Sequence, residues 1–194
     1  MTAQEYLAWE DGQLEKHDWY DGEVFAMSGG TARHSALDAA VIVELGIALR
    51  GGRCRVLSSD QRVAARTGKH FVYPDATVVC GPLRFEPGTT DVLANPTAVV
   101  EVLSEGTQSY DRGMKWSGYQ LLESLDDFLL VTQYAVRIEH FQREEGGTWR
   151  YRAAGPGERV TLKSGASFEV DAVYAGVFEV AGEAEPVRAV AEKG

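Results

Sequence analysis

Tyr73-Pro74-Asp75-Ala76-Thr77-Val78-Val79 is a β-branched, apolar run that carries a single carboxylate, and Ala98-Val99-Val100-Glu101-Val102-Leu103 repeats this pattern further along the chain. Runs of this kind predict buried β-strands. An isolated charge in such a strand is costly unless something compensates it. Two acids on neighbouring strands could share one hard cation, which prefers oxygen ligands. The two runs therefore predict a divalent-metal site.

The length and composition fit one ordinary globular domain. The chain has 194 residues, of which 44% are hydrophobic and 25% charged, enough for a sizeable core. It contains no apolar stretch long enough to span a membrane, and residues 1–5 lack the features of a signal peptide. Cys54 and Cys80 show no metal-ligand spacing, so we expect reduced core thiols and a cytoplasmic location.

The charge distribution is uneven, although the net charge is −10. Residues 1–23 contain seven acids and one lysine, whereas residues 46–75 contain six basic residues and two acids. Nucleic-acid-binding surfaces are usually basic. The basic segment is either part of such a surface or a solvated hairpin, and charge alone does not decide between them.

The hydrophobic spacing predicts two main helices. In residues 34–50, Leu37, Val41, Leu45 and Leu49 recur every four residues, and Thr31 or Ser35 can cap this helix. Residues 109–123 form the second predicted helix, and residues 2–9 a short one. Asp21-Gly22 predicts a hairpin within residues 19–27. The other predicted strands are 53–57, 61–65, 72–80, 98–103, 126–132, 136–143, 148–153, 158–162 and 167–170.

This order of elements predicts an α/β fold with a mixed central β-sheet flanked by helices and added β-hairpins. We expect a single domain over residues 1–178, followed by a frayed, acidic and Ala-rich tail over residues 179–194. No glycine-rich phosphate loop joins a strand to a helix, which argues against a nucleotide-binding fold.

Lys115 is the candidate partner of the two strand acids. A divalent cation held by Asp75 and Glu101 can activate water, and a nearby cation can stabilise the charge that develops on phosphorus. Lys115 shares one helical face with Asp111 and Tyr119, each four residues away. The alternatives remain open: Lys115 in an exposed ion pair with Asp111, Asp75 as a turn residue, and Glu101 as a partnered structural acid.

The sequence resembles the Uma-two family of restriction-endonuclease-like proteins, within the PD-(D/E)XK nuclease superfamily. The resemblance covers roughly residues 2–145, and more loosely extends to about 178. The stretches that carry it, in order, are Glu5-Tyr6-Leu7-Ala8-Trp9-Glu10, residues 15–30, Arg33-His34, Tyr73-Pro74-Asp75, Glu101-Val102-Leu103-Ser104 and Tyr110-Asp111-Arg112-Gly113-Met114-Lys115.

The resemblance implies a restriction-endonuclease-like core in which Asp75 and Glu101 bind the metal. The usual motif has a lysine two residues after the second acid, where this chain has Leu103. The resemblance therefore implies that Lys115 replaces it from the following helix. Glu23 is either a further acid near the metal or a solvent-facing hairpin residue.

Two further residues lie within the stretches that carry the resemblance. His34 is either a phosphate contact at a helix N-terminus or a surface histidine. Asp18 stands where the family often has glutamate, and we do not include it in the predicted site.

These observations favour a Mg²⁺- or Mn²⁺-dependent endonuclease that hydrolyses phosphodiester bonds in DNA. Nucleases of this build commonly act as dimers, so a homodimer is expected by analogy with the fold. One alternative is a catalytically inactive interaction protein that retains the nuclease fold, and another is a hydrolase of other phosphoesters. The missing strand lysine and the acidic net charge favour the inactive alternative.

Overall fold

The computed structural model describes residues 1–27 and 30–179; the predicted tail, apart from Glu179, lies outside these residues. None of the helices in the described ranges is long and apolar enough to cross a membrane. The helices are α1 (Ala3–Glu10), α2 (Ala32–Ala48), α3 (Gln108–Tyr110), α4 (Trp116–Tyr119) and α5 (Val170–Tyr174), with shorter turns η1 (Asp111–Lys115), η2 (Glu145–Gly147) and η3 (Val177–Glu179).

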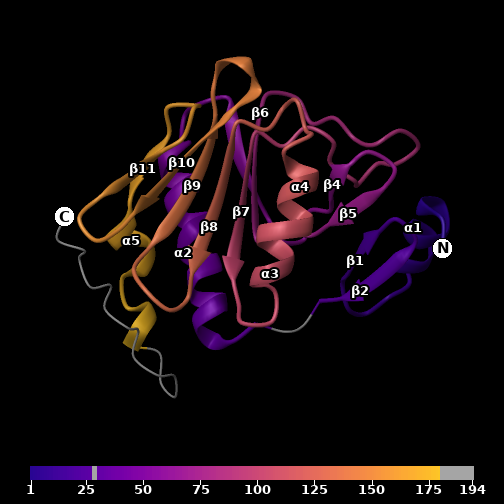
Figure 1. The fold of residues 1–194 in the computed structure, drawn as a ribbon, viewed down its shortest axis with the longest axis horizontal. Coiled ribbons are helices and arrows are strands. Elements are labelled where there is room, and N and C mark those ends of the chain that lie inside the picture. The colour runs from indigo at the N-terminus through magenta and orange to yellow at the C-terminus, as the bar shows by residue number, and fades with distance from the viewer. Residues whose placement is uncertain (28–29, 180–194) are drawn as a thin grey trace.

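A six-stranded mixed sheet forms the centre of the fold (Figure 1), in the order β10-β9-β8-β7-β6-β3. Its strands are β3 (Cys54–Ser58), β6 (Ala76–Cys80), β7 (Ala98–Leu103), β8 (Asp127–Thr132), β9 (Ile138–Arg143) and β10 (Trp149–Ala154). The pair β7–β8 is parallel and the other pairs are antiparallel. The predicted mixed α/β sheet is therefore confirmed.

A second sheet of four strands lies beside the first, in the order β2-β1-β5-β4. It comprises β1 (His17–Tyr20), β2 (Glu23–Ala26), β4 (Val63–Arg66) and β5 (His70–Val72), and a separate two-stranded sheet comprises β11 (Arg159–Thr161) and β12 (Ser167–Glu169). The predicted Asp-Gly hairpin joins β1 to β2, with positive φ at Asp21 and Gly22. The predicted added hairpins are thus present.

The strand that we predicted over residues 72–80 is interrupted at Tyr73-Pro74-Asp75. β5 ends at Val72 in the small sheet, and β6 starts at Ala76 in the large one. Pro74 has no N–H for a ladder bond and restricts the residue before it. Tyr73, Pro74 and Asp75 therefore carry the chain from one sheet to the other, which places Asp75 where the two sheets meet.

Helix α2 covers one face of the six-stranded sheet, behind it in the view of Figure 1. Thr31 caps the helix by accepting the His34 N–H at 3.1 Å. The four residues of the predicted stripe are all buried, and they pack with residues of β6 and β7 such as Val78 and Val100. The predicted helix therefore forms and buries the expected face.

Helices α3 and α4 cover the opposite face, in front of the sheet in Figure 1. Tyr119 and Leu122 pack there with Val99, Phe128 and Leu130. The predicted helix over 109–123 is shorter than expected, ending at Tyr119, and it is interrupted by the π-helical turn η1. Asp111 and Lys115, at the two ends of this turn, are both buried.

Cys54 and Cys80 form a disulfide, so our expectation of reduced thiols is wrong. They lie directly opposite each other on β3 and β6, with Cα atoms 3.9 Å apart. Their separation of 26 residues in the chain gave no indication of this pairing. Strand register, which brings them together, is set by packing over the whole sheet.

We expect Gly118→Ala to destabilise the fold, because α4 packs closely against β4 and β5. A Cβ at Gly118 would lie 3.1 Å from His70 Nδ1 and 3.3 Å from the Cβ and carbonyl oxygen of Ala65. Overpacking of this kind costs about 1–3 kcal/mol, more than the roughly 0.5–1 kcal/mol that alanine gains over glycine in a helix. The urea unfolding midpoint should fall.

Gly113→Ala is the matched control, because nothing lies within 4 Å of a Cβ at that position. Its unfolding midpoint should stay unchanged or rise slightly. Equal midpoints for the two variants would contradict close packing at α4.

Candidate functional site

A cleft of about 380 Å³ lies at the end of the six-stranded sheet where β6 begins and β7 ends. The strands β1 and β2, helix α2 and the turn η1 all contribute to its walls. The charged residues that line it are Asp18, His34, Asp75, Glu101, Asp111 and Lys115. Sequence-distant acids therefore meet in one cavity, as predicted for Asp75 and Glu101.

Lys115 lies at the centre of an ion cluster in this cleft. Its Nζ is 3.0 Å from Glu101 Oε2, 3.1 Å from Asp111 Oδ1 and 3.7 Å from Asp18 Oδ2. All four side chains are at most 6% exposed. Lys115 is thus a buried ammonium shared by three carboxylates, and the exposed Asp111 pair considered from sequence is excluded.

The turn η1 supplies Lys115 and Asp111 to this cluster. The backbone N–H of Trp116 bonds to the carbonyl of Asp111, five residues back, as in a π-helix. Single-turn π-helical insertions are rare in proteins overall, but those that occur are frequently found at functional sites. Here both ends of the π-helical turn project buried charged side chains into the cleft.

Glu101 has a partner for each of its oxygens. Oε2 accepts from Lys115, and Oε1 accepts from the Tyr119 hydroxyl at 2.7 Å. Burial raises the pKa of Glu101 well above its usual range, and Lys115 opposes this rise. The predicted face shared by Asp111, Lys115 and Tyr119 therefore exists, because all three side chains are directed toward Glu101 or its lysine.

Asp75 immediately precedes β6 and reaches the end of β7. Its Oδ2 accepts the backbone N–H of Val102 at 2.6 Å. The strands β6 and β7 pair antiparallel with Ala76 opposite Val100, so the predicted pairing of the two runs is confirmed. Asp75, before the start of β6, and Glu101, near the end of β7, therefore lie at the same end of the sheet.

His34, Asp38 and Asp75 form a second cluster, on the side of the cleft next to α2. His34 Nδ1 is 3.4 Å from Asp38 Oδ2, and His34 Nε2 is 3.8 Å from Asp75 Oδ2. One ligand atom from each of the three residues lies within 4.8 Å of the others. Asp38 Oδ1 is buried and makes no hydrogen bond to any described residue. This donor set suits a divalent cation.

Burial is the largest cause acting on the pKa values in the cleft, and neighbouring charges add to it or oppose it. Burial raises the pKa of Asp75 to about 6, with the charge of Asp38 adding to the rise. Burial also raises the pKa of Asp18, against the attraction of Lys115. Burial alone would lower the pKa of Lys115, but the carboxylates around it raise that pKa well above its usual range. The lysine therefore stays charged.

Sequence reasoning missed two acids of the site and included one residue that lies elsewhere. Asp18 is 3% exposed, and it accepts the Tyr73 N–H at 3.0 Å while facing Lys115. Asp38 follows His34 by one helical turn, a spacing that could have indicated it. Glu23 is exposed at the hairpin and is not among the residues that line the cleft.

Lys115→Met should destabilise the protein strongly, because it leaves three buried carboxylates without their cation. Breaking a buried ion pair in this way costs about 3–5 kcal/mol. The loss is read from urea unfolding at neutral pH.

Lys16→Met is the control for Lys115→Met. Lys16 pairs with Asp60 at 2.6 Å, but their side chains are 37% and 84% exposed, and such pairs contribute about 0–1 kcal/mol. Losses of similar size in the two lysine variants would show that the buried cluster is not held by its cation.

Comparisons with known proteins agree with this fold. The family model "Uma2: Putative restriction endonuclease" matches residues 3–173. In Synechocystis, the uncharacterized protein slr1290 is 35% identical over 178 residues, covering 91% of this chain and 93% of its own. The uncharacterized protein sll1609 is 28% identical over 149 residues, covering 77% and 84%.

A solved structure from Anabaena variabilis, described as a putative nuclease belonging to DUF820, has the same fold. Its TM-score is 0.72 at 15% identity, and the match covers 91% of this chain and 99% of that one. Fold and sequence thus agree with the resemblance carried by the Pro-Asp, Glu-Val-Leu and Asp-Arg-Gly-Met-Lys stretches. The chain belongs to the Uma2 family of restriction-endonuclease-like proteins.

Proposed function

We propose that this protein is a divalent-metal-dependent nuclease that hydrolyses phosphodiester bonds in DNA. One observation carries the proposal: among the described residues, four carboxylates line one cleft with one lysine and one histidine, and a fifth carboxylate, Asp38, contacts that histidine. That excess of buried negative charge calls for a further cation. Membership of a nuclease family supports a nucleic acid as the substrate.

The residues present fit a hard divalent cation. Asp75 and Glu101 are the proposed ligands, with Asp38 and His34 as further candidates beside Asp75. The unpartnered Oδ1 of Asp38 supports this assignment, since a buried carboxylate oxygen without a donor is costly. Bound there, such a cation would supply an activated water and polarise a phosphoryl oxygen.

Lys115 is the proposed stabiliser of charge in the transition state. Its buried carboxylate partners keep the ammonium charged and fix its position at the cleft wall. Pre-positioned donors of this kind act without reorganisation during the reaction. The contact between Lys115 and Glu101 supports the view that this lysine replaces the one missing at Leu103.

An inactive, nuclease-fold interaction protein remains the second candidate. The observation in its favour is that both oxygens of Glu101 already have partners, in Lys115 and Tyr119. A purely structural acid would be satisfied in the same way. The two candidates differ in whether the cleft binds metal and cuts DNA.

Asp75→Asn and Glu101→Gln should each reduce cleavage of plasmid DNA in Mg²⁺ or Mn²⁺ by at least about 100-fold, because each removes a metal-binding charge. The rate is followed on gels, and circular dichroism checks folding. Glu23→Gln is the control, because Glu23 is exposed outside the cleft, and its rate should equal that of the unaltered protein. Absence of cleavage by that protein with either metal would favour the inactive candidate.

Asp38→Asn should weaken Mn²⁺ binding by about 10- to 100-fold, the range typical of lost supporting groups at metal sites. Calorimetric titration of Mn²⁺ measures this without any nucleic acid. An unchanged affinity would remove Asp38 from the site while leaving Asp75 and Glu101 to be judged by cleavage.

A further inference from the structure

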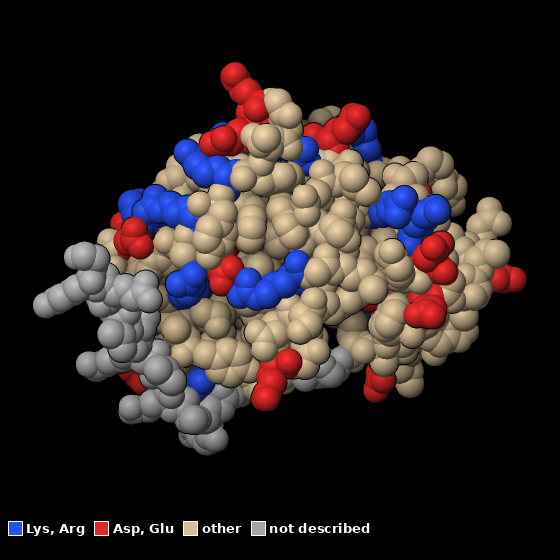
Figure 2. Space-filling model, viewed as in Figure 1, with Lys and Arg blue, Asp and Glu red and all other residues tan. Residues whose placement is uncertain are grey.

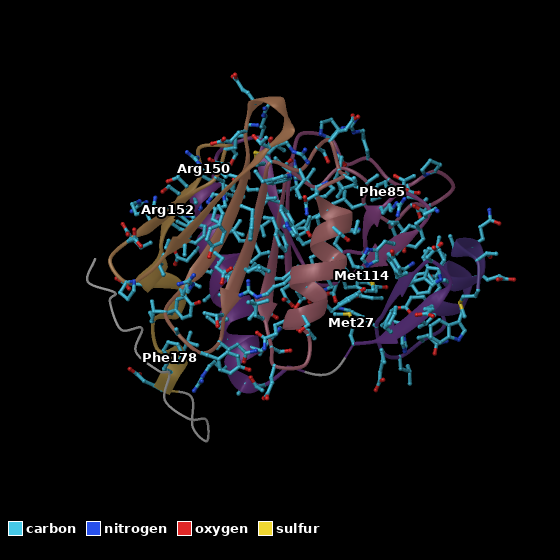
Figure 3. The ribbon with its side chains drawn as sticks, viewed as in Figure 1. Met27, Phe85, Met114, Arg150, Arg152 and Phe178 are labelled. Carbon is cyan, nitrogen blue, oxygen red and sulfur yellow. A yellow bond between two sulfur atoms is a disulfide. The ribbon has the colours of Figure 1, made fainter. Side chains whose placement is uncertain are left out.

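The opposite end of the six-stranded sheet carries a basic surface that the proposed active site does not use. A hollow of about 320 Å³ lies between β10 and β11, and its charged lining residues are Arg150, Arg152, Arg159 and Lys163. No carboxylate is among the described residues that line it. In Figure 3, Arg150 and Arg152 project outward at the edge of the sheet.

Each of these four cations pairs with an acid, Arg159 with Glu169. Arg152 pairs with Glu158 at 2.7 Å, Lys163 with Asp126 at 2.8 Å and Arg150 with Glu144 at 3.6 Å. Most of the side chains in these pairs are about half exposed, and exposed pairs contribute little energy. The pairs therefore orient the cations while leaving their remaining N–H groups available to another anion.

Hydrogen bonds that start from a buried acid of the sheet also orient Arg150. Asp127 is 1% exposed and accepts from His140 and Gln142, each at 2.8 Å. The Gln142 amide oxygen in turn accepts from Arg150. A buried carboxylate thus fixes the glutamine that positions an arginine over the hollow.

A second hollow, of about 630 Å³, adjoins the first through Lys163. It adds Arg50 and Arg53, for which no ion pair is found with any described residue, and one acid, Asp126, which pairs with Lys163. Six cations therefore follow one continuous surface across the two hollows. Figure 2 shows basic side chains along the β10 side of the molecule, with single acidic side chains beside them.

This surface is separate from the cleft. The cleft is lined by Asp75 and Val102, at the start of β6 and the end of β7, whereas the second hollow reaches Cys80 and Thr97, at the other ends of these strands. The first hollow lies along β9 and β10, at the edge of the sheet. Strands of five or six residues span roughly 17–20 Å. A nucleic acid bound in the cleft would reach the basic surface only through a more distant stretch of its backbone.

The geometry points to a second nucleic-acid contact, in which these six cations bind backbone phosphates of DNA away from the site of cleavage. A row of cations over adjoining hollows suits the repeated charge of a phosphate backbone better than a single small anion. The choice of DNA rests on the proposed function. The contact would offset the repulsion between an acidic protein and its polyanionic substrate.

The test measures binding of a labelled duplex of about 30 base pairs in EDTA, so that no cleavage occurs. Arg50→Ser with Arg53→Ser, and Arg150→Ser with Arg152→Ser, should each weaken binding by about tenfold at roughly 100 mM NaCl. Each double variant should also make the slope of log K against log salt shallower by about 2.

Arg66→Ser with Lys69→Ser is the matched control, because it removes the same charge from an exposed hairpin. Its affinity and salt slope should change much less. Glu144→Gln removes the acid opposite Arg150 and should tighten binding, a gain that misfolding would not produce. Equal losses in the patch and control variants, or no gain with Glu144→Gln, would overturn the proposal.

Inorganic phosphate is titrated in parallel to distinguish the source of the anion. Phosphate binding that depends on Arg150 and Arg152, with duplex binding unaffected by their loss, would also overturn it. Failure of this proposal is distinguishable from failure of the nuclease assignment. The former appears as unchanged duplex binding in EDTA, and the latter as absence of metal-dependent cleavage.

Discussion

The buried ammonium of Lys115 is the interaction on which the site depends. It joins β1, β7 and the π-helical turn through Asp18, Glu101 and Asp111. These elements belong to different parts of the chain and to both sheets. A buried charge is tolerated only when it is paired. Each of these elements must therefore stay in place for the charged side chains of the others to remain neutralised.

The cleft lies where the chain passes from the small sheet to the large one. Pro74 ends the ladder of the small sheet, and the chain enters the large sheet at Ala76. Asp75 therefore sits at a strand end, where its carboxylate can reach beyond the sheet toward α2 instead of being buried between strands. A residue two positions later, such as Thr77, is fully buried within the sheet. The break in the strand is thus what makes Asp75 available to a ligand.

The features predicted from sequence are those encoded by local patterns. The stripe Leu37–Leu49 marked the buried face of α2, Asp21-Gly22 marked a hairpin, and Glu101 stood out as a charge in an apolar strand. Each signal reflects the period of one element or the conformational needs of one turn. The pairing of β6 with β7 followed from two such strands and was confirmed.

The features that escaped prediction depend on contacts between distant segments. The disulfide Cys54–Cys80 follows from strand register. The role of Asp18 follows from the packing of the small sheet against η1. No local sequence pattern distinguishes a π-helical turn from an α-helix, so the exact placement of Lys115 was not accessible. Glu23 and Asp18 lie in the same acidic hairpin and on the same face of it, since Asp18 pairs with Phe25 and Tyr20 with Glu23, so only tertiary packing separates the buried acid from the exposed one.

Net charge is a poor guide to what this molecule binds, because its charges are segregated along the sheet. Acids crowd the end where β7 finishes, and basic residues gather at the end where it begins. A cleft with surplus carboxylates repels phosphate unless a metal ion intervenes. An attractive surface elsewhere would then govern encounter with the proposed substrate, since steering acts over about a Debye length, roughly 8–10 Å at physiological salt. The net charge of −10 is therefore compatible with a nucleic-acid partner, provided that a metal ion binds at one end of the sheet and arginines contact the nucleic acid at the other.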